Sequence, residues 1–121
     1  MTTPQKAKGS AFEREIVTYL RAHGFPYAER GVAGATEDIG DIIGTPGIVW
    51  ECKNQKRMVL AGWVDELLVE IANQLTRYKN GGPLVLGAVI HKRKGKSSAG
   101  DYYATMPLHI YVDLLKTAGY R

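Results

Sequence analysis

The chain has 121 residues, of which 45% are hydrophobic and 23% are charged, with a net charge of +4 and a pI near 9.2. This composition is ordinary for one globular domain with its own core, and no apolar run approaches the ~20 residues that span a bilayer. A single cysteine excludes an internal disulfide, and with only three scattered histidines it argues against a zinc site. We therefore expect a cytoplasmic protein, not a membrane protein, whose mild basic charge weakly favours nucleic acid.

The first predicted elements are an arm and a helix. Residues 1–9 are expected to form a flexible basic arm ahead of a single domain over residues 10–121. Ser10 and Glu13 have capping-box spacing, so Ser10 is expected to begin a helix that ends at Gly24. Glu13 could be a capping acid and nothing more. It also heads the apolar stripe of this helix, and a carboxylate that faces a sheet needs a partner or a metal.

Three strands and a long helix are expected next. Residues 25–32 form a possible first strand, and residues 38–43 and 48–53 flank a Thr-Pro-Gly turn that predicts a β-hairpin. From residue 60 to about residue 79, apolar residues recur every three or four positions, which predicts a helix.

The last third of the chain returns to strands and ends in a helix. The continuous apolar run 84–90 predicts a buried central strand, and 101–106 a short strand. Pro107 suits the first position of a final helix, which Gly119 would end. The order α-β-β-β-α-β-β-α predicts one mixed central β-sheet flanked by helices, in the α/β (α+β) class.

The hairpin carries the candidate functional residues. Because side chains alternate along a strand, Glu51 and Lys53 share one face, and Trp50 and Cys52 point to the other, into a core. The predicted hairpin folds Asp41 back beside Glu51. Two acids and a lysine would then meet at the end of a sheet, where a hard divalent cation and a phosphate can be held together. This arrangement suggests metal-dependent phosphodiester cleavage.

Two alternatives apply to these residues. Asp38 competes with Asp41, but Asp41 lies closer to the turn and can pair across from Glu51. Glu51 and Lys53 could instead form a surface charge ladder. Against this, the other residues of their strand are typical of a buried core strand, where charged residues are costly.

Other motifs are weaker. The cluster Lys92, Arg93, Lys94 and Lys96 fits a solvated loop as well as a phosphate contact, and a nearby metal site favours the contact. A Gly-Lys-Ser at residues 95–97 looks like the end of a P-loop, but the first glycine of that motif would fall on an isoleucine. On the long helix, Gln74 and Tyr78 share one edge; alone, they suggest a polar rim and a core tyrosine.

Taken together, these residues resemble archaeal-type Holliday junction resolvases of the restriction-endonuclease-like PD-(D/E)XK nuclease superfamily. The downstream stretches 54–63 and 91–103 are similar to small phage-encoded resolvases. The usual proline before the metal-binding aspartate is a glycine here, and Gln74-x-x-x-Tyr78 resembles a motif of RecB-type exonucleases. The matching segments are Lys8-Gly9-Ser10, Glu13-Arg14-Glu15, Gly24-Phe25, Arg30, Gly40-Asp41-Ile42 and Glu51-Cys52-Lys53.

The resemblance implies roles for single residues. Mg²⁺ or Mn²⁺ would be bound by Asp41, Glu51 and the main-chain carbonyl of Cys52, with Glu13 in the same site. Lys53 would orient or activate the attacking water. Arg30 would contact a phosphate. With the basic cluster described above, the residues expected to bind DNA are Lys8, Arg14, Arg30, Lys92, Arg93, Lys94 and Lys96.

The function implied by the resemblance is a homodimeric endonuclease that resolves four-way junctions in branched DNA without a small-molecule cofactor. If the chain is phage-encoded, it would act in the host cytoplasm. Gln74 and Tyr78 favour a second hypothesis, an exonuclease or end-processing nuclease. A third is a DNA-binding module without turnover, against which the intact acids and lysine argue. Trp63, Tyr102 and Tyr111 are candidates for a dimer interface, and each could equally be core.

Overall fold

The computed structural model describes residues 3–31, 38–78, 82 and 84–121. It confirms a mixed α+β fold and the predicted order of helices and strands. In the described part, no helix is long and apolar enough to cross a membrane. The elements are α1 (Pro4–Ala22), β1 (Glu29–Arg30), β2 (Ile42–Ile43), β3 (Ile48–Lys53), α2 (Leu60–Thr76), β4 (Leu86–His91), a 3₁₀ turn (Ala99–Asp101), β5 (Tyr103–Thr105) and α3 (Leu108–Thr117).

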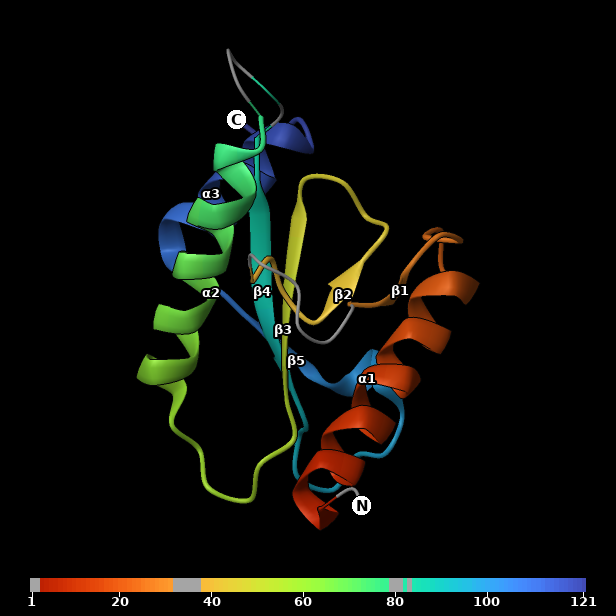
Figure 1. Ribbon diagram of the computed structural model, residues 1–121. Helices are drawn as coiled ribbons and strands as arrows, with labels where there is room; N and C mark the ends of the chain where they lie inside the picture. The colour runs from red at the N-terminus through yellow and green to blue at the C-terminus, as the bar shows by residue number, and fades with distance from the viewer. Residues whose placement is uncertain (1–2, 32–37, 79–81, 83) are drawn as a thin grey trace.

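The main sheet has three strands in the order β3-β4-β5. β3 and β4 are parallel, in a register that pairs Glu51 with Val89 and Lys53 with His91, and β4 and β5 are antiparallel. α2 is the crossover that a parallel pair requires. Figure 1 shows α2 and α3 on one side of this sheet and α1 on the other.

The predicted hairpin is wrong in its pairing. β2 forms an antiparallel ladder with β1, which is much shorter than the predicted strand 25–32, and β2 and β3 belong to different sheets. Gly44 has a φ of +87°, and a side chain there would run into the main chain of Tyr27. This close approach brings β2 against the segment that leads into β1. Between the two segments of the predicted hairpin, the Asp41 N–H still donates to the Trp50 carbonyl at 2.7 Å.

The first helix begins earlier than predicted. α1 starts at Pro4, and the Thr3 side chain accepts a hydrogen bond from the Lys6 N–H at 3.2 Å. An N-cap threonine followed by proline is a strong helix start. The prediction that Ser10 begins the helix is therefore wrong, and residues 4–9, expected as a flexible arm, are helical. The Ser10 hydroxyl accepts instead from Arg30 Nη2 at 3.0 Å.

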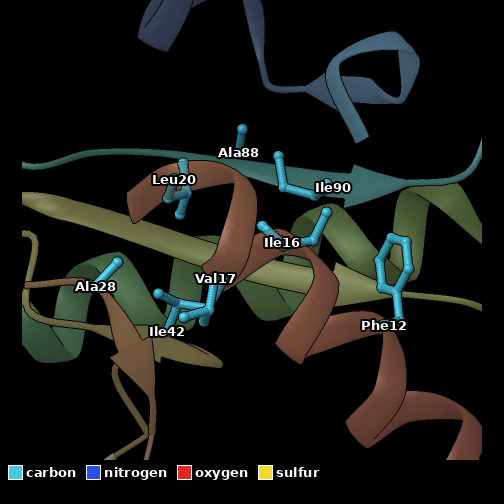
Figure 2. Packing of buried hydrophobic residues seen from close by; sticks show 8 residues of the cluster. All are labelled: Phe12, Ile16, Val17, Leu20, Ala28, Ile42, Ala88 and Ile90. Atoms are coloured by element: carbon cyan, nitrogen blue, oxygen red, sulfur yellow. The ribbon is translucent and has the colours of Figure 1, made fainter. Parts of the chain in front are cut away.

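Two apolar clusters hold the layers together, one on each side of β3. Trp50 and Cys52 pack against the cluster under α1, and Val49 belongs to the cluster under α2 and α3, as the alternation along the strand predicts. Figure 2 shows the α1 cluster, formed by Phe12, Ile16, Val17, Leu20, Ala28, Ile42, Ala88 and Ile90. The other is formed by Val49, Trp63, Leu67, Ile71, Val85, Val89 and Ile110.

Candidate active site

β3 places Glu51 and Lys53 on the side of the sheet that α2 covers. Glu51 is only 4% exposed, so it is not part of a surface charge ladder. Lys53 Nζ lies 3.4 Å from Glu51 Oε1 and 2.7 Å from Glu66 Oε2, so it joins an acid on the strand to an acid on the helix. Burial lowers the pKa of Lys53, but the hydrogen bond to Glu66 and the charge of Glu51 outweigh it and leave the pKa raised. The ammonium is therefore charged at neutral pH.

Asp41 reaches Glu51 although the hairpin ladder is missing. Gly40, with a φ of +107°, precedes it, and a Cβ there would lie 2.9 Å from the Trp50 carbonyl oxygen. This glycine lets the chain press against β3, so that Asp41 Oδ2 accepts a hydrogen bond from the Cys52 N–H at 2.7 Å. Burial, followed by the charge of Glu51, raises the pKa of Asp41 to about 7. Two crowded carboxylates of this kind are suited to a cation.

α1 brings Glu13 toward the same group. Its charge contributes to the raised pKa of Asp41. Arg30 Nε donates to Glu13 Oε1 at 3.0 Å. The arginine that we expect to contact a DNA phosphate therefore binds Glu13 when no DNA is present. Burial, and then the charges of Asp41 and Glu13, raise the pKa of Cys52, which keeps its thiol neutral. A neutral thiol is a poor metal ligand, so only the carbonyl of Cys52 remains a candidate.

Glu70 on α2 was missed by the sequence analysis. It is 3% exposed and faces Glu51 and Asp38. Burial, and then the proximity of those two carboxylates, raises its pKa to about 11. A signal was present, because Glu70 lies on the buried stripe of α2 with Leu67 and Gln74. Like Glu13, Glu70 is an acid on the apolar stripe of its helix, and such an acid needs a partner or a metal.

The oxygen atoms of this site fit a hard cation. Glu51 Oε2, Glu70 Oε1 and Gln74 Oε1 are buried without a hydrogen-bond partner in the described part of the chain. Across the ranges that the structure describes, no three acid, histidine or cysteine side chains form a ready metal cluster. Mg²⁺ usually keeps several waters and takes one or two carboxylates, so a pair of acids with a carbonyl oxygen is sufficient.

The basic residues expected to bind DNA are exposed. Lys8 and Arg14 project from α1, and the loop of residues 92–96 follows β4. Lys92 Nζ lies 5.9 Å from the centre of the Phe12 ring, and the Arg93 guanidinium lies 6.0 Å from that of Tyr103. Figure 1 shows this loop at the same end of the molecule as the start of α1. The basic loop and the start of α1 therefore lie at one end of the molecule (Figure 1).

Gln74 is buried and Tyr78 is partly buried. Gln74 is 8% exposed, and Tyr78 packs against the cluster under α2. The glutamine is therefore not the polar rim residue that its spacing alone suggested, whereas the tyrosine packs against the core as expected.

Comparison with models of known protein families gives a match. The model of a family described as archaeal Holliday junction resolvase (Hjc) matches residues 4–94, well over half of the chain. The matched range runs from the start of α1 into the basic loop and includes Glu13, Asp41, Glu51 and Lys53. No curated protein and no solved structure gave a match.

Proposed function

The chain belongs to the archaeal Holliday junction resolvase family, and from this premise we propose that it is a divalent-metal-dependent endonuclease for four-way DNA junctions. Resolvases of this family act on branched DNA and are generally dependent on a divalent metal. The mixed sheet with flanking helices is consistent with a restriction-endonuclease-like fold. The observation that carries the proposal is the convergence of Asp41, Glu51 and Lys53 on and beside β3.

Each side chain has a distinct part in the proposed reaction. Asp41 and Glu51 would hold Mg²⁺ or Mn²⁺, together with the Cys52 carbonyl. A cation bound there supplies charge stabilisation on the scissile phosphate and lowers the pKa of a bound water. Lys53, anchored at 2.7 Å by Glu66, directs its charged ammonium toward the water and the phosphate. Glu13, fixed by Arg30, supplies a further acceptor for water at the edge of the site.

Substrate binding is proposed to use the exposed basic residues. The loop of residues 92–96, with Lys8 and Arg14 on α1, offers contacts to the phosphate backbone. Arg30 would exchange its bond to Ser10 for a phosphate oxygen while Nε stays on Glu13. Contacts of this kind select DNA by shape, which suits a branched substrate.

A two-fold dimer follows from the chemistry of resolution. One chain presents one site, whereas a junction needs two symmetric cuts, which a C₂ dimer provides. Each of the three interface candidates could equally be core, and for Trp63 the core alternative holds, because it is 4% exposed in the cluster under α2. Tyr102 donates to Glu15 at 2.8 Å and its ring lies 5.6 Å from that of Phe12, so it too serves internal packing.

The remaining candidate, Tyr111, lies on an apolar surface. It is 49% exposed on α3, next to Leu108 at 76%. A groove of about 380 Å³ runs between α2 and α3, with Leu75 and Leu84 in its lining. Exposed apolar patches of this kind mark protein interfaces. We therefore place the proposed dimer contact on α3 and this groove.

An exonuclease or end-processing nuclease is the second candidate. It is favoured by Gln74, whose buried amide oxygen has no partner within the described ranges and lies one helical turn from Glu70.

The experiment compares a fixed four-way junction with a linear duplex of the same sequence, in Mg²⁺ and in excess EDTA, alongside solution mass by light scattering. We expect a dimer, paired cuts in matched strands of the junction, little cleavage of the duplex and none in EDTA. A monomer that nicks the duplex as fast as the junction would overturn the resolvase proposal. Stepwise loss of nucleotides from duplex ends would favour the exonuclease, and full cleavage in EDTA would exclude metal dependence.

A further inference from the structure

α2 carries two buried side-chain oxygens that the proposed reaction does not use: Glu70 lies against Glu51, and Gln74 lies one helical turn further along. Glu70 and Gln74 are 3% and 8% exposed and lie one turn apart on the same edge of the helix. Glu70 Oε1 and Gln74 Oε1 have no hydrogen-bond partner among the described residues, and neither has Glu51 Oε2. Buried polar atoms are paired in nearly all native proteins, so three such oxygens on β3 and the helix that covers it indicate an absent partner.

The protein groups nearby do not supply that partner. Lys53 is engaged by Glu51 Oε1 and by Glu66. Asn73 donates its amide to the backbone carbonyl of Asp38 rather than to a carboxylate. Asp38 adds a further negative charge near Glu70, and its Oδ1 accepts from the Gly40 N–H. Oxygen atoms therefore face one another, and either a proton on Glu70 or a cation between them is needed to relieve their repulsion.

The other side of Glu51 is better compensated. There Asp41 has the Cys52 N–H and Glu13 has the Arg30 guanidinium. The carboxylate oxygens that lack a positively charged or N–H partner in the described part therefore lie on the α2 side of Glu51.

We propose that Glu51, Glu70 and Gln74 form a binding position for a divalent cation on the α2 side of β3, with Glu51 shared between it and the Asp41 side. Two carboxylates and an amide oxygen are hard ligands, and they suit Mg²⁺ or Mn²⁺. A cation in this position would hold the Glu51 carboxylate in place for its proposed role as a metal ligand together with Asp41. The inference rests on the proposed function, since it extends the same site.

The test uses the full chain without DNA. Glu70→Gln removes one carboxylate at nearly constant volume, and Gln74→Leu removes the amide oxygen. Asp65→Asn is the matched control, because Asp65 is an exposed acid on the same helix. Asp41→Asn reports on the other side of Glu51. Two quantities are measured for each variant: the melting temperature in EDTA, and Mn²⁺ binding from the electron paramagnetic resonance signal of the free ion.

In EDTA, Glu70→Gln should melt at least as high as the wild type, because the amide keeps the volume and can donate to Glu51 as the protonated carboxyl of Glu70 does. Its Mn²⁺ binding should weaken at least tenfold or lose one ion per chain, Gln74→Leu should weaken binding in the same direction, and Asp65→Asn should match the wild type. A residue that only supports the fold would instead lower the melting temperature when changed.

Wild-type Mn²⁺ binding in Glu70→Gln would overturn the inference, as would a lower melting temperature of that variant in EDTA. Loss of Mn²⁺ binding in Asp41→Asn alone would also overturn it and leave the proposed function standing. Failure of the proposed function shows separately, as wild-type protein that does not cut a junction in Mg²⁺ or Mn²⁺.

Discussion

The two faces of β3 are built on different principles. On the face toward α1, Trp50 and Cys52 pack against an apolar cluster, and the Trp50 Nε1–H donates to the Thr45 hydroxyl at 2.8 Å. On the face toward α2, the strand continues from Val49 into Glu51 and Lys53, and buried carboxylate oxygens lack donors in the described part. The first face is apolar. The second contributes Val49 to a core cluster and then carries unfavourable charge, which natural proteins tolerate at functional sites.

Asp41→Asn should have the largest effect on cleavage, and it tests the functional role of the α2 face of β3. The amide oxygen can still accept the Cys52 N–H that Asp41 now accepts at 2.7 Å, so the local fold should survive. Loss of one ligand charge should slow junction cleavage by roughly two orders of magnitude or more, with DNA affinity retained. The measurement is the single-turnover rate at saturating enzyme in Mg²⁺. A rate within a few-fold of the wild type would remove Asp41 from the site.

Lys53→Ala should slow cleavage to an extent close to that of Asp41→Asn, because the ammonium held by Glu51 and Glu66 is removed from the reacting centre. Affinity should fall by about one phosphate interaction, seen as a change of roughly 0.9 in the slope of log affinity against log salt. Lys56→Ala, an exposed lysine in the next loop, is the control and should cut at a near-normal rate. Normal cleavage by Lys53→Ala would make the lysine a structural residue.

On the apolar side, Ile16→Ala should change stability rather than chemistry. Ile16 is 4% exposed in the cluster under α1. Its truncation should lower the free energy of unfolding by about 2–5 kcal/mol, and the cleavage rate per folded molecule should stay within a few-fold of the wild type. Urea unfolding gives the first quantity, with the exposed Thr18→Ala as control. Loss of cleavage without loss of stability would contradict the assignment of Ile16 to the fold rather than to the reaction.

The smallest effect is expected from the basic loop. Neutralising Lys92, Arg93, Lys94 and Lys96 together should weaken binding to junction and duplex alike. The log–log salt slope should decrease by roughly one for each phosphate that the loop no longer neutralises. Fluorescence anisotropy at several salt concentrations measures it. An unchanged slope would show that these exposed side chains are ordinary solvated surface.

Local patterns predicted much of this arrangement. The period-two alternation on β3 placed Glu51 and Lys53 opposite Trp50 and Cys52, because side-chain direction on a strand is fixed by the backbone. The continuous apolar run before the basic loop likewise predicted the central strand β4.

Features decided by tertiary contacts were not predictable in the same way. β2 pairs with β1 because a glycine at position 44 allows a close approach to residue 27, and spacing does not reveal this. Ser10 and Glu13 have the spacing of a capping box, but the helix already begins after the N-cap Thr3, so Ser10 lies within the helix. Glu70 becomes an acid beside Glu51 only when α2 docks over β3, although its stripe indicates burial.

The most direct test of the central claim is the free energy of unfolding of Glu51→Gln in EDTA, measured beside the wild type. Glu51 is 4% exposed and carries an unpaired oxygen, and Lys53 keeps Glu66 as a partner at 2.7 Å when the Glu51 charge is removed. If Glu51 serves the reaction and not the fold, the variant should be at least as stable as the wild type, because burying its charge is costly and the change removes that cost. A loss of more than about 1 kcal/mol would contradict this, because a hydrogen bond to a charged group contributes about that much or more to folding.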